Sequence, residues 1–346
     1  MFRKGIISAG NWIIDHLKVI DNFPDRGNLS TITTVVGNAL GGCSHNVLVD
    51  LARLQTGLPL WAGGIVGNDS DGAYIMDEIR KYGIDDSFMS VRDGVTTSFT
   101  DVMSEMNTGA RTFFHYRGAN ALLDYPDFIN MDTSARIFHL GYLLLLDTLD
   151  SPDAEFGTVA AKVLHLLKSK GYETSVDVVS EQGDRFRKIV TPSLKYTDYI
   201  IFNEVEAEAC TSIKLRNTDG LCRDNLAKSA KYLFQQGVAR MVVIHFPEGG
   251  FAMRSDGVHA FVDSYPVSSS EIKSTVGAGD AFCAGVLYGI HEGWSLGGLL
   301  NFANANARFN LLSESSTGGA VPLQEVHAYM VAQHDTQALI AAFNKS

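Results

Sequence analysis

The segment Thr275-Val276-Gly277-Ala278-Gly279-Asp280-Ala281-Phe282 places two glycines and an alanine directly before an acid. Apolar residues then recur at helical spacing, which predicts a helix that starts near Gly279. The exposed N–H groups of Gly277, Ala278 and Gly279, with the positive end of the helix dipole, would bind an anion. Because Asp280 would repel that anion, we predict a chemical use for it: it accepts a proton from a hydroxyl that attacks a phosphoryl group. The alternative is that Asp280 only caps the helix.

Composition narrows the class of protein. The 346 residues suffice for one large α/β domain with an appendage, or for two domains. Lys and Arg number 28 against 39 Asp and Glu, a net charge of −11. This charge argues against nucleic acid or an anionic membrane as a partner. An anionic substrate would therefore need a local device such as a helix start.

Cysteine and histidine usage predicts a cytoplasmic protein. There is no C-x-x-C pair and no Cys/His spacing typical of zinc, so we expect reduced, mostly buried thiols at Cys43, Cys210, Cys222 and Cys283. The histidines suggest no metal cluster, and we expect hydrogen bonds near the site for His16, His45 and His245. The apolar run at the start of the chain predicts a first strand and no signal peptide, and no stretch approaches the ~20 apolar residues of a membrane span.

Apolar runs alternate with helical patterns along most of the chain. This alternation predicts a doubly wound, mostly parallel α/β sheet with helices on both faces and a ligand crevice beyond the carboxyl ends of the strands. The predicted strands are 5–9, 60–66, 137–140, 174–179, 199–202 and 241–245, and the predicted helices are 44–54, 74–82, 156–170 and 225–236.

Two regions break the alternation. Residues 17–36 and 96–116 carry strand-type patterns without an intervening helix, and residues 107–110 are a predicted hairpin turn. We interpret them as a small antiparallel β lid on a core domain of residues 1–16, 37–95 and 117–346. A lid beside a substrate crevice would exclude water during phosphoryl transfer.

A second glycine-rich loop enters a helix upstream. Gly41 and Gly42 would let a ligand approach the backbone, and Asn46 one turn later offers both a donor and an acceptor to hydroxyls. Asn11 and Asp15 follow the first strand, where the crevice should open, and the Asp15 carboxylate could accept two sugar hydroxyls. The alternatives are a plain loop with a cap at Gly41-Gly42 and an exposed loop acid at Asp15.

Asn203 and Glu206 follow the predicted strand 199–202. They are three residues apart and would share one face of the first helical turn. An amide and a carboxylate at a strand end suit a hydrated Mg²⁺, which keeps its waters. The same residues would also form a capping box, and both interpretations can hold together.

These motifs, in this order and spacing, resemble the ribokinase-like (PfkB) carbohydrate kinases across residues 5 to about 322. The resemblance implies ATP-dependent phosphorylation of a hydroxymethyl group on a small-molecule sugar. Asp280 would be the base, and the amides of Gly277, Ala278 and Gly279 the anion hole. The sugar site would contain Asn11, Asp15, Gly41, Gly42 and Asn46. Asn203 and Glu206 would organise Mg²⁺ through water.

The resemblance also implies where the nucleotide binds. The helix at 301–307 would flank the adenine with Asn304, and Thr275, Asn203 and Glu206 would lie near the nucleotide. His245 to Gly250 would form the nucleotide loop; its last glycine is kept, but Pro247 lacks an N–H, so contacts with ATP must differ there. We also expect a homodimer that forms through the lid.

Three questions stay open at this point. The family often has Asp-Thr before the glycine motif, where the Asp helps hold a monovalent cation; Ser274 stands there instead, which predicts weak potassium activation. Arg117, at the junction of lid and core, could reach an anionic or ketose substrate or form a structural salt bridge. The substrate is expected to be a neutral or acidic sugar of the fructose, ribose or 2-keto-3-deoxygluconate type. The alternatives are a nucleoside kinase and a non-catalytic sugar-binding regulator.

Overall fold

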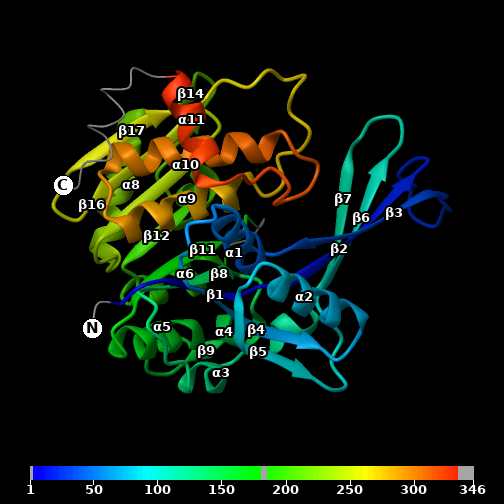
Figure 1. The fold of residues 1–346 in the computed structure, drawn as a ribbon, viewed down its shortest axis with the longest axis horizontal. Helices are drawn as coiled ribbons and strands as arrows, with labels where there is room; N and C mark the ends of the chain where they lie inside the picture. The colour runs from blue at the N-terminus through cyan, green and yellow to red at the C-terminus, as the bar shows by residue number, and fades with distance from the viewer. Residues whose placement is uncertain (1–2, 181–184, 334–346) are drawn as a thin grey trace.

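The chain is described by a computed structural model that covers residues 3–180 and 185–333 (Figure 1). Its centre is a nine-stranded sheet in the order β17-β16-β15-β12-β11-β8-β1-β4-β5. The strands from β15 to β5 in this order run parallel, while β16 and β17 are antiparallel. The strands are β1 Ile6–Gly10, β4 Leu60–Gly67, β5 Asp85–Arg92, β8 Ile137–Leu143, β11 Glu173–Val178, β12 Tyr199–Asn203, β15 Met241–Phe246, β16 Gly249–Arg254 and β17 His259–Asp263.

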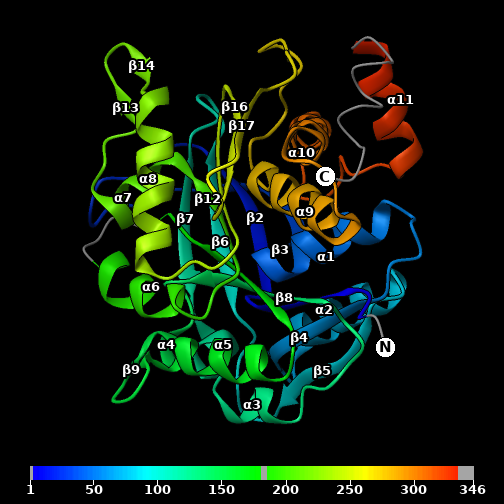
Figure 2. The same ribbon diagram turned by 90° about the vertical axis from the view of Figure 1, so that its left-hand side faces the viewer.

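Helices cover both faces of this sheet, as Figure 2 shows with the sheet seen between them. Neighbouring strand residues such as Ile6 and Ile7 belong to opposite hydrophobic clusters, because side chains alternate across a strand. One face carries α1 Cys43–Arg53, α2 Ser70–Lys81, α9 Ala278–Glu292, α10 Leu296–Leu311 and α11 Leu323–Gln333. The other carries α5 Val159–Ser169, α6 Phe186–Leu194, α7 Glu204–Thr211 and α8 Arg223–Gln236. The predicted doubly wound fold is confirmed.

The remaining elements are short. The 3-10 helix η1 is Gly118–Leu122, and the helices α3 and α4 are Pro126–Ile129 and Asp147–Asp150. Two small hairpins are β9 Pro152–Asp153 with β10 Gly157–Thr158, and β13 Arg216–Asn217 with β14 Gly220–Leu221. The helix predicted from residue 156 begins at Val159, because Thr158 is its N-cap and accepts the N–H of Ala161.

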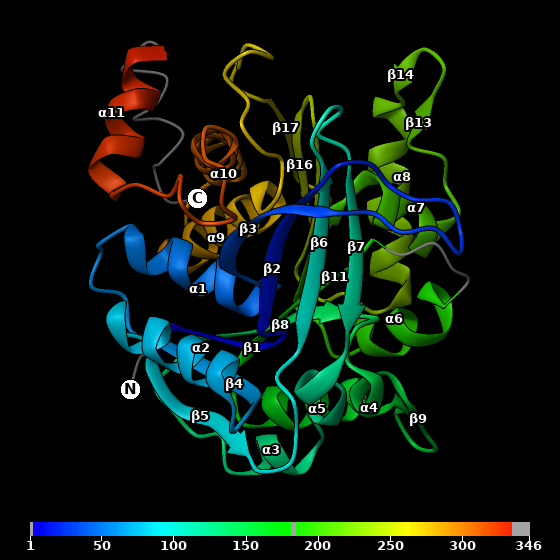
Figure 3. The same ribbon diagram turned by 90° about the vertical axis from the view of Figure 1, so that its right-hand side faces the viewer.

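A separate four-stranded sheet projects from the main body (Figures 1 and 3). Its strands are β2 Ile13–Ile20, β3 Ile32–Gly41, β6 Phe99–Glu105 and β7 Arg111–Tyr116, in the order β3-β2-β6-β7. Each hairpin is antiparallel, as expected for the lid, but β2 and β6 pair in parallel because both lead outward from the core. The turn at residues 107–110 joins β6 and β7 as predicted, where Gly109 donates to the carbonyl of Glu105.

The lid strands reach further toward the core than residues 17–36. Strand β2 starts at Ile13 and β3 ends at Gly41, so Asp15 belongs to a lid strand. The expected core domain includes residues 1–2, 181–184 and 334–346, which lie outside the described residues. Within the described chain, every helix is too short or too polar to cross a membrane.

Candidate active site

The start of α9 depends on a glycine at position 277. Gly277 is the N-cap residue with φ of 80°, and a Cβ atom there would lie 2.2 Å from the carbonyl oxygen of Ser316. Only glycine avoids both the strain and the clash. The helix itself runs from Ala278, one residue before the predicted start. Because Gly277 occupies the N-cap position, the alternative in which Asp280 is the cap is wrong.

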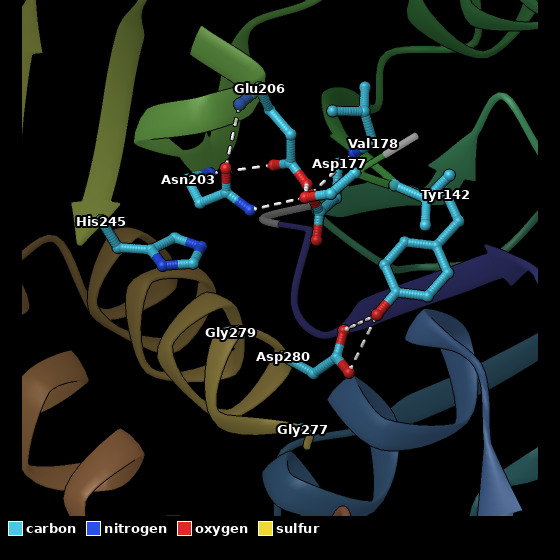
Figure 4. A pocket seen from close by; sticks show the side chains of 11 residues that line it. Tyr142, Asp177, Val178, Asn203, Glu206, His245, Gly277, Gly279 and Asp280 are labelled. Carbon is cyan, nitrogen blue, oxygen red and sulfur yellow. Dashed lines mark hydrogen bonds between the residues drawn. The ribbon is translucent and has the colours of Figure 1, made fainter. Parts of the chain in front are cut away.

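Asp280 lies in the first turn of α9 with its carboxyl group held from two sides. The Asn46 side chain donates to Oδ2 at 2.7 Å. The Tyr142 hydroxyl donates to the carboxylate at 3.1 Å from Oδ1 and 3.2 Å from Oδ2, as Figure 4 shows. The residue is 5% exposed, and this burial raises the pKa of Asp280, while the hydrogen bonds from Asn46 and Tyr142 oppose the rise. The arrangement orients a carboxylate whose affinity for a proton is increased, as a general base requires.

A cavity of about 200 Å³ opens beside Asp280. Among the described residues, eleven line it, and three of them carry carboxyl groups: Asp177, Glu206 and Asp280. These eleven include no lysine or arginine. Burial raises the pKa of Glu206 to about 7, and burial with repulsion from Glu206 and Asp280 raises the pKa of Asp177 well above its usual value. Three acids around one small space favour a divalent cation, which would relieve their repulsion.

Asn203 and Glu206 form the predicted capping box at the start of α7. The Asn203 Oδ1 accepts the Glu206 N–H at 2.9 Å, and the Glu206 Oε2 accepts the Asn203 N–H at 2.9 Å. Ser180 joins them by donating to Glu206 Oε1 at 2.7 Å and accepting from Asn203 Nδ2 at 2.9 Å. Both side chains still line the cavity (Figure 4). Each oxygen of the Glu206 carboxylate can accept a further hydrogen bond. Asn203 and Glu206 therefore fit a hydrated Mg²⁺ that they would hold through its waters.

A second cavity of about 710 Å³ shares Asn203, His245 and Gly279 with the first. Its walls are largely apolar and include Tyr265, Pro266, Val267, Ile272, Ala307 and Leu311. Among the described residues that line it, Arg308 is the one arginine or lysine. An apolar slot that leads to a glycine-lined helix start suits a nucleotide base at one end and its phosphates at the other.

Several of the residues predicted to bind the nucleotide line the larger cavity, and Gly250 does not. Thr275, His245 and Asn304 line the larger cavity, and the Asn304 amide donates to the carbonyls of Val262 and Asp263. Burial lowers the pKa of His245 to about 4, so its ring is neutral and offers no charge to a phosphate. Gly250 lies outside the wall: its backbone packs against Phe282, and a Cβ atom there would lie 2.8 Å from that ring.

Of the predicted sugar residues, Asp15, Gly41 and Gly42 lie at the base of the lid, and Asn46 lies beside Asp280. A Cβ atom on Gly41 would meet the Asp15 carboxylate at 2.9 Å, so these two residues are adjacent at the base of the lid. Gly42 precedes α1 with φ of 90°. Asn46 contacts Asp280 directly. Burial raises the pKa of Asp15 to about 6, with Thr100 and His16 opposing the rise.

The side chain of Asn11 is hydrogen-bonded within the protein and is not available to a sugar. Its side chain is fully buried and donates to the carbonyls of Gly141 and Tyr142 at 3.3 and 3.2 Å, while its oxygen accepts from Asn120 at 3.2 Å. The amide therefore supports the last residues of β8, and the predicted sugar contact is corrected to a supporting role. Sequence spacing could not show this, because Asn120 and β8 are distant from Asn11 in the chain.

Arg117 forms the salt bridge that the sequence left as an alternative. Its Nη1 lies 3.1 Å from an oxygen of Asp147 and donates to the Leu144 carbonyl at 2.8 Å. The side chain lines neither cavity. Of the histidines expected near the site, His45 pairs with Asn46 at 2.9 Å and His16 with Asp71 at 3.0 Å.

Three residues of the site escaped the sequence analysis: Tyr142, Asp177 and Ser180. Asp177 is the last residue but one of the buried strand β11, and an acid at the carboxyl end of a buried parallel strand is a signal that could have found it. Tyr142 offered no such signal, since it follows a glycine in an apolar run and has an unusual positive φ of 57°.

Comparison with known proteins agrees with this geometry. A family model described as pfkB family carbohydrate kinase matches residues 4–322. The 5-dehydro-2-deoxygluconokinase of Clostridium botulinum (strain Alaska E43 / Type E3) is 25% identical over 303 residues, 84% of each chain. The probable fructokinase-3 of Arabidopsis thaliana is 26% identical over 316 residues, 88% of this chain and 85% of the other.

Solved structures show the same fold. The Arabidopsis thaliana ribokinase complexed with ribose and ATP superposes with a TM-score of 0.77 at 18% identity, covering 95% of this chain and 99% of the ribokinase.

Proposed function

The chain belongs to the pfkB family of carbohydrate kinases and is a phosphotransferase that acts on a sugar; from this premise we propose that it transfers the γ-phosphate of ATP to a hydroxymethyl group of a neutral or acidic sugar. The sugar is of the fructose, ribose or 2-keto-3-deoxygluconate type. One observation carries the proposal: a buried carboxylate, Asp280, stands at a glycine-lined helix start where the two cavities meet.

Asp280 is the general base of this reaction. Its carboxylate accepts the hydroxyl proton as the sugar oxygen bonds to the γ-phosphorus and ADP leaves. Asn46 and Tyr142 hold both carboxylate oxygens, so the base is oriented before the sugar arrives. The backbone N–H groups of Gly277 and Gly279 stabilise the charge on the transferring phosphoryl group. The Ala278 N–H, the third donor predicted from the sequence, already donates to the Thr275 carbonyl at 3.3 Å.

Asn203 and Glu206 would hold Mg²⁺ through its waters, with Asp177 facing the same cavity. The ion would supply positive charge to the phosphates, because the described residues that line this cavity include no lysine or arginine. ATP occupies the larger cavity with its base against the apolar wall. The lid covers the sugar and excludes water from the transfer.

The substrate preference follows from charge. The proposed sugar site contains Asp15 and Asp280, and the segments 10–15 and 41–46 contain no Lys or Arg. A phosphorylated sugar brings nearly two negative charges and would need dedicated cations. Arg117 is already paired with Asp147, and Arg26 and Arg111 are exposed on the lid. The name of the clostridial relative, which denotes a kinase of a sugar acid, supports a neutral sugar or one with a single carboxylate.

A competition experiment tests this preference. We expect kcat/KM to be higher for fructose, ribose or 2-keto-3-deoxygluconate than for fructose 6-phosphate or tagatose 6-phosphate. A clear preference for either phosphate ester would contradict the proposal. Turnover with adenosine but with none of the sugars would favour the nucleoside-kinase alternative. A non-catalytic regulator is disfavoured, because sugar binding alone needs no oriented base at Asp280.

We also propose a cytoplasmic location, which the four free cysteines support.

Replacing Tyr142 by phenylalanine should lower kcat about tenfold at neutral pH, because one hydrogen bond to a charged group is lost. The Tyr142 hydroxyl opposes the rise in the Asp280 pKa, so its removal raises that pKa further. The acidic limb of the pH profile of kcat/KM should therefore move to higher pH, while KM for the sugar changes little. An unchanged acidic limb would show that Tyr142 does not act on the base.

Activation by potassium should be weak. The Ser274 hydroxyl is buried and accepts the Val276 N–H at 3.1 Å, and a neutral hydroxyl attracts a monovalent ion far less than a carboxylate does. The rate is measured with potassium chloride against a choline salt at matched ionic strength. The matched variant Ser274→Asp should gain potassium dependence. A large, saturable activation of the wild-type enzyme would refute this expectation.

We propose that the lid mediates a homodimer with a second copy of this chain. Its outer surface exposes apolar side chains, with Leu29 93%, Val35 72% and Val36 60% exposed, and β3 is an edge strand. Sedimentation should show a dimer for the wild-type chain and a monomer for Val35→Asp. The control Val258→Asp, at an exposed position outside the lid, should remain dimeric. A monomeric wild-type protein would contradict the proposal.

A further inference from the structure

Three metal-binding side chains from distant parts of the chain meet next to the candidate active site. Cys43 begins α1, His139 lies in β8 and Asp177 lies in β11. The Cys43 sulfur is 3.4 Å from His139 Nε2 and 3.6 Å from Asp177 Oδ2. One ligand atom from each residue lies within 4.8 Å of the other two. Cys43 and His139 are 0% exposed and Asp177 is 7% exposed, so the three side chains meet in the protein interior.

These separations match the edges of a small coordination shell. Zinc binds sulfur at about 2.3 Å and nitrogen or oxygen at about 2.0–2.2 Å in a tetrahedron, which places its ligand atoms about 3.3–3.8 Å apart. The two contacts of the Cys43 sulfur, at 3.4 and 3.6 Å, already lie in that range. The Cys283 sulfur, 3.9 Å from His139 Nε2, stands beside the group as a further donor. A cation could therefore enter with small side-chain shifts.

His139 is oriented for this purpose from its other side. Its Nδ1 lies 3.1 Å from the Ser175 hydroxyl, and this contact turns Nε2 toward the Cys43 sulfur. Histidine ligands of metals usually have such an outer partner, which fixes the ring and its tautomer. Packing alone would not require a thiol and a carboxyl group near the second ring nitrogen of His139.

The charges of the group balance a divalent ion. A Cys43 thiolate and an Asp177 carboxylate bring two negative charges, and neutral His139 adds none, so a bound M²⁺ is neutralised in the protein interior. The thiolate favours zinc and similar transition metals, whereas Mg²⁺ prefers oxygen ligands. Asp177 lines the smaller cavity, which gives an ion a route to the group.

We propose that Cys43, His139 and Asp177 form a binding site for a zinc-class divalent ion, separate from the Mg²⁺ position at Asn203 and Glu206. Binding replaces the thiol proton of Cys43, and the proton of Asp177 where that carboxyl group is protonated, with the metal and releases these protons to solvent. Since Asp177 faces the catalytic cavity, the site would couple the supply of such an ion to the state of the active site.

Cobalt(II) is the probe for this site. The reduced, metal-free protein is titrated with Co²⁺ in the presence of excess Mg²⁺, so that oxygen-ligand positions are filled. We expect one equivalent to produce a thiolate-to-cobalt charge-transfer band in the near ultraviolet, and one equivalent of Zn²⁺ to remove it. Co²⁺ bound at Asn203 and Glu206 cannot give this band, because neither residue contributes sulfur.

Variants assign the band to these residues. Cys43→Ala should abolish it, and the control Cys222→Ala, which removes a thiol at the start of α8, should keep it. Ser175→Ala should weaken Co²⁺ binding by about 10- to 100-fold, as expected for loss of an outer partner. Should Cys43→Ala not fold, the conservative change His139→Gln, which keeps the thiol, should weaken binding instead. No charge-transfer band in the wild-type protein, or one that survives in folded Cys43→Ala, would overturn the proposal.

Discussion

Replacing Asp280 by asparagine should lower kcat by roughly 10²–10⁴-fold, the usual contribution of a general base. Asparagine has nearly the size of aspartate and keeps an oxygen that can accept from Asn46 or Tyr142, so the fold and the sugar affinity should change little. What it lacks is the capacity to take the proton. Steady-state kinetics with the best sugar of the panel, together with sugar binding by calorimetry, measures both effects.

The matched control is Asp50→Asn. Asp50 is also a fully buried acid, in α1, but it lines neither cavity. Its replacement removes a carboxyl group from the same face of the sheet and should leave kcat near the wild-type value. If Asp280→Asn keeps more than about a tenth of wild-type turnover, the assignment of Asp280 as base is wrong.

Replacing Gly277 by alanine should lower kcat by about 100-fold or more, since misplacement of reacting groups by about 1 Å has that effect. The added Cβ atom would lie 2.2 Å from the Ser316 carbonyl oxygen, so the backbone at the start of α9 must move. That movement displaces the N–H groups that hold the phosphoryl group and shifts Asp280 with them. Strain at a positive φ also lowers the free energy of unfolding, by about 1–2 kcal/mol.

A substitution at Gly293, at the other end of the same helix, separates the loss of kcat from the loss of stability. Its φ is 73°, close to that of Gly277, but a Cβ atom there would have no neighbour within 4 Å. Gly293→Ala should therefore lose similar stability through strain while kcat stays near the wild-type value. Equal kcat for Gly277→Ala and Gly293→Ala would show that the start of α9 does not hold the reacting phosphate.

Much of the fold could be predicted from the sequence because apolar residues recur at different spacings in its strands and in its helices. The apolar runs at 60–66 and 241–245 are strands β4 and β15, as predicted. The parallel pairing of β2 with β6 was not predicted. The two strands are far apart in the sequence, and the chain passes through the core domain between them. Strand ends in the lid were also misplaced, because alternation continues smoothly into the core loops.

The site was predictable where one short segment carries the chemistry. Gly277 to Asp280 and the Asn203–Glu206 pair are local, and backbone geometry alone decides how they are presented. Tyr142 and Asp177 were missed because only tertiary packing brings them to Asp280. The Cys43 cluster was invisible for the same reason: its members are 96 and 134 residues apart, so no spacing rule applies.

Phosphorus NMR of the products is the most direct measurement. The enzyme is incubated with ATP, Mg²⁺ and each sugar or nucleoside of the panel. We predict sugar-dependent formation of ADP and one new phosphomonoester signal, split into a triplet by the two protons of a hydroxymethyl carbon, and its loss in Asp280→Asn. A phosphate on a secondary hydroxyl, a product from nucleosides alone, or no product with any sugar would contradict the proposed function.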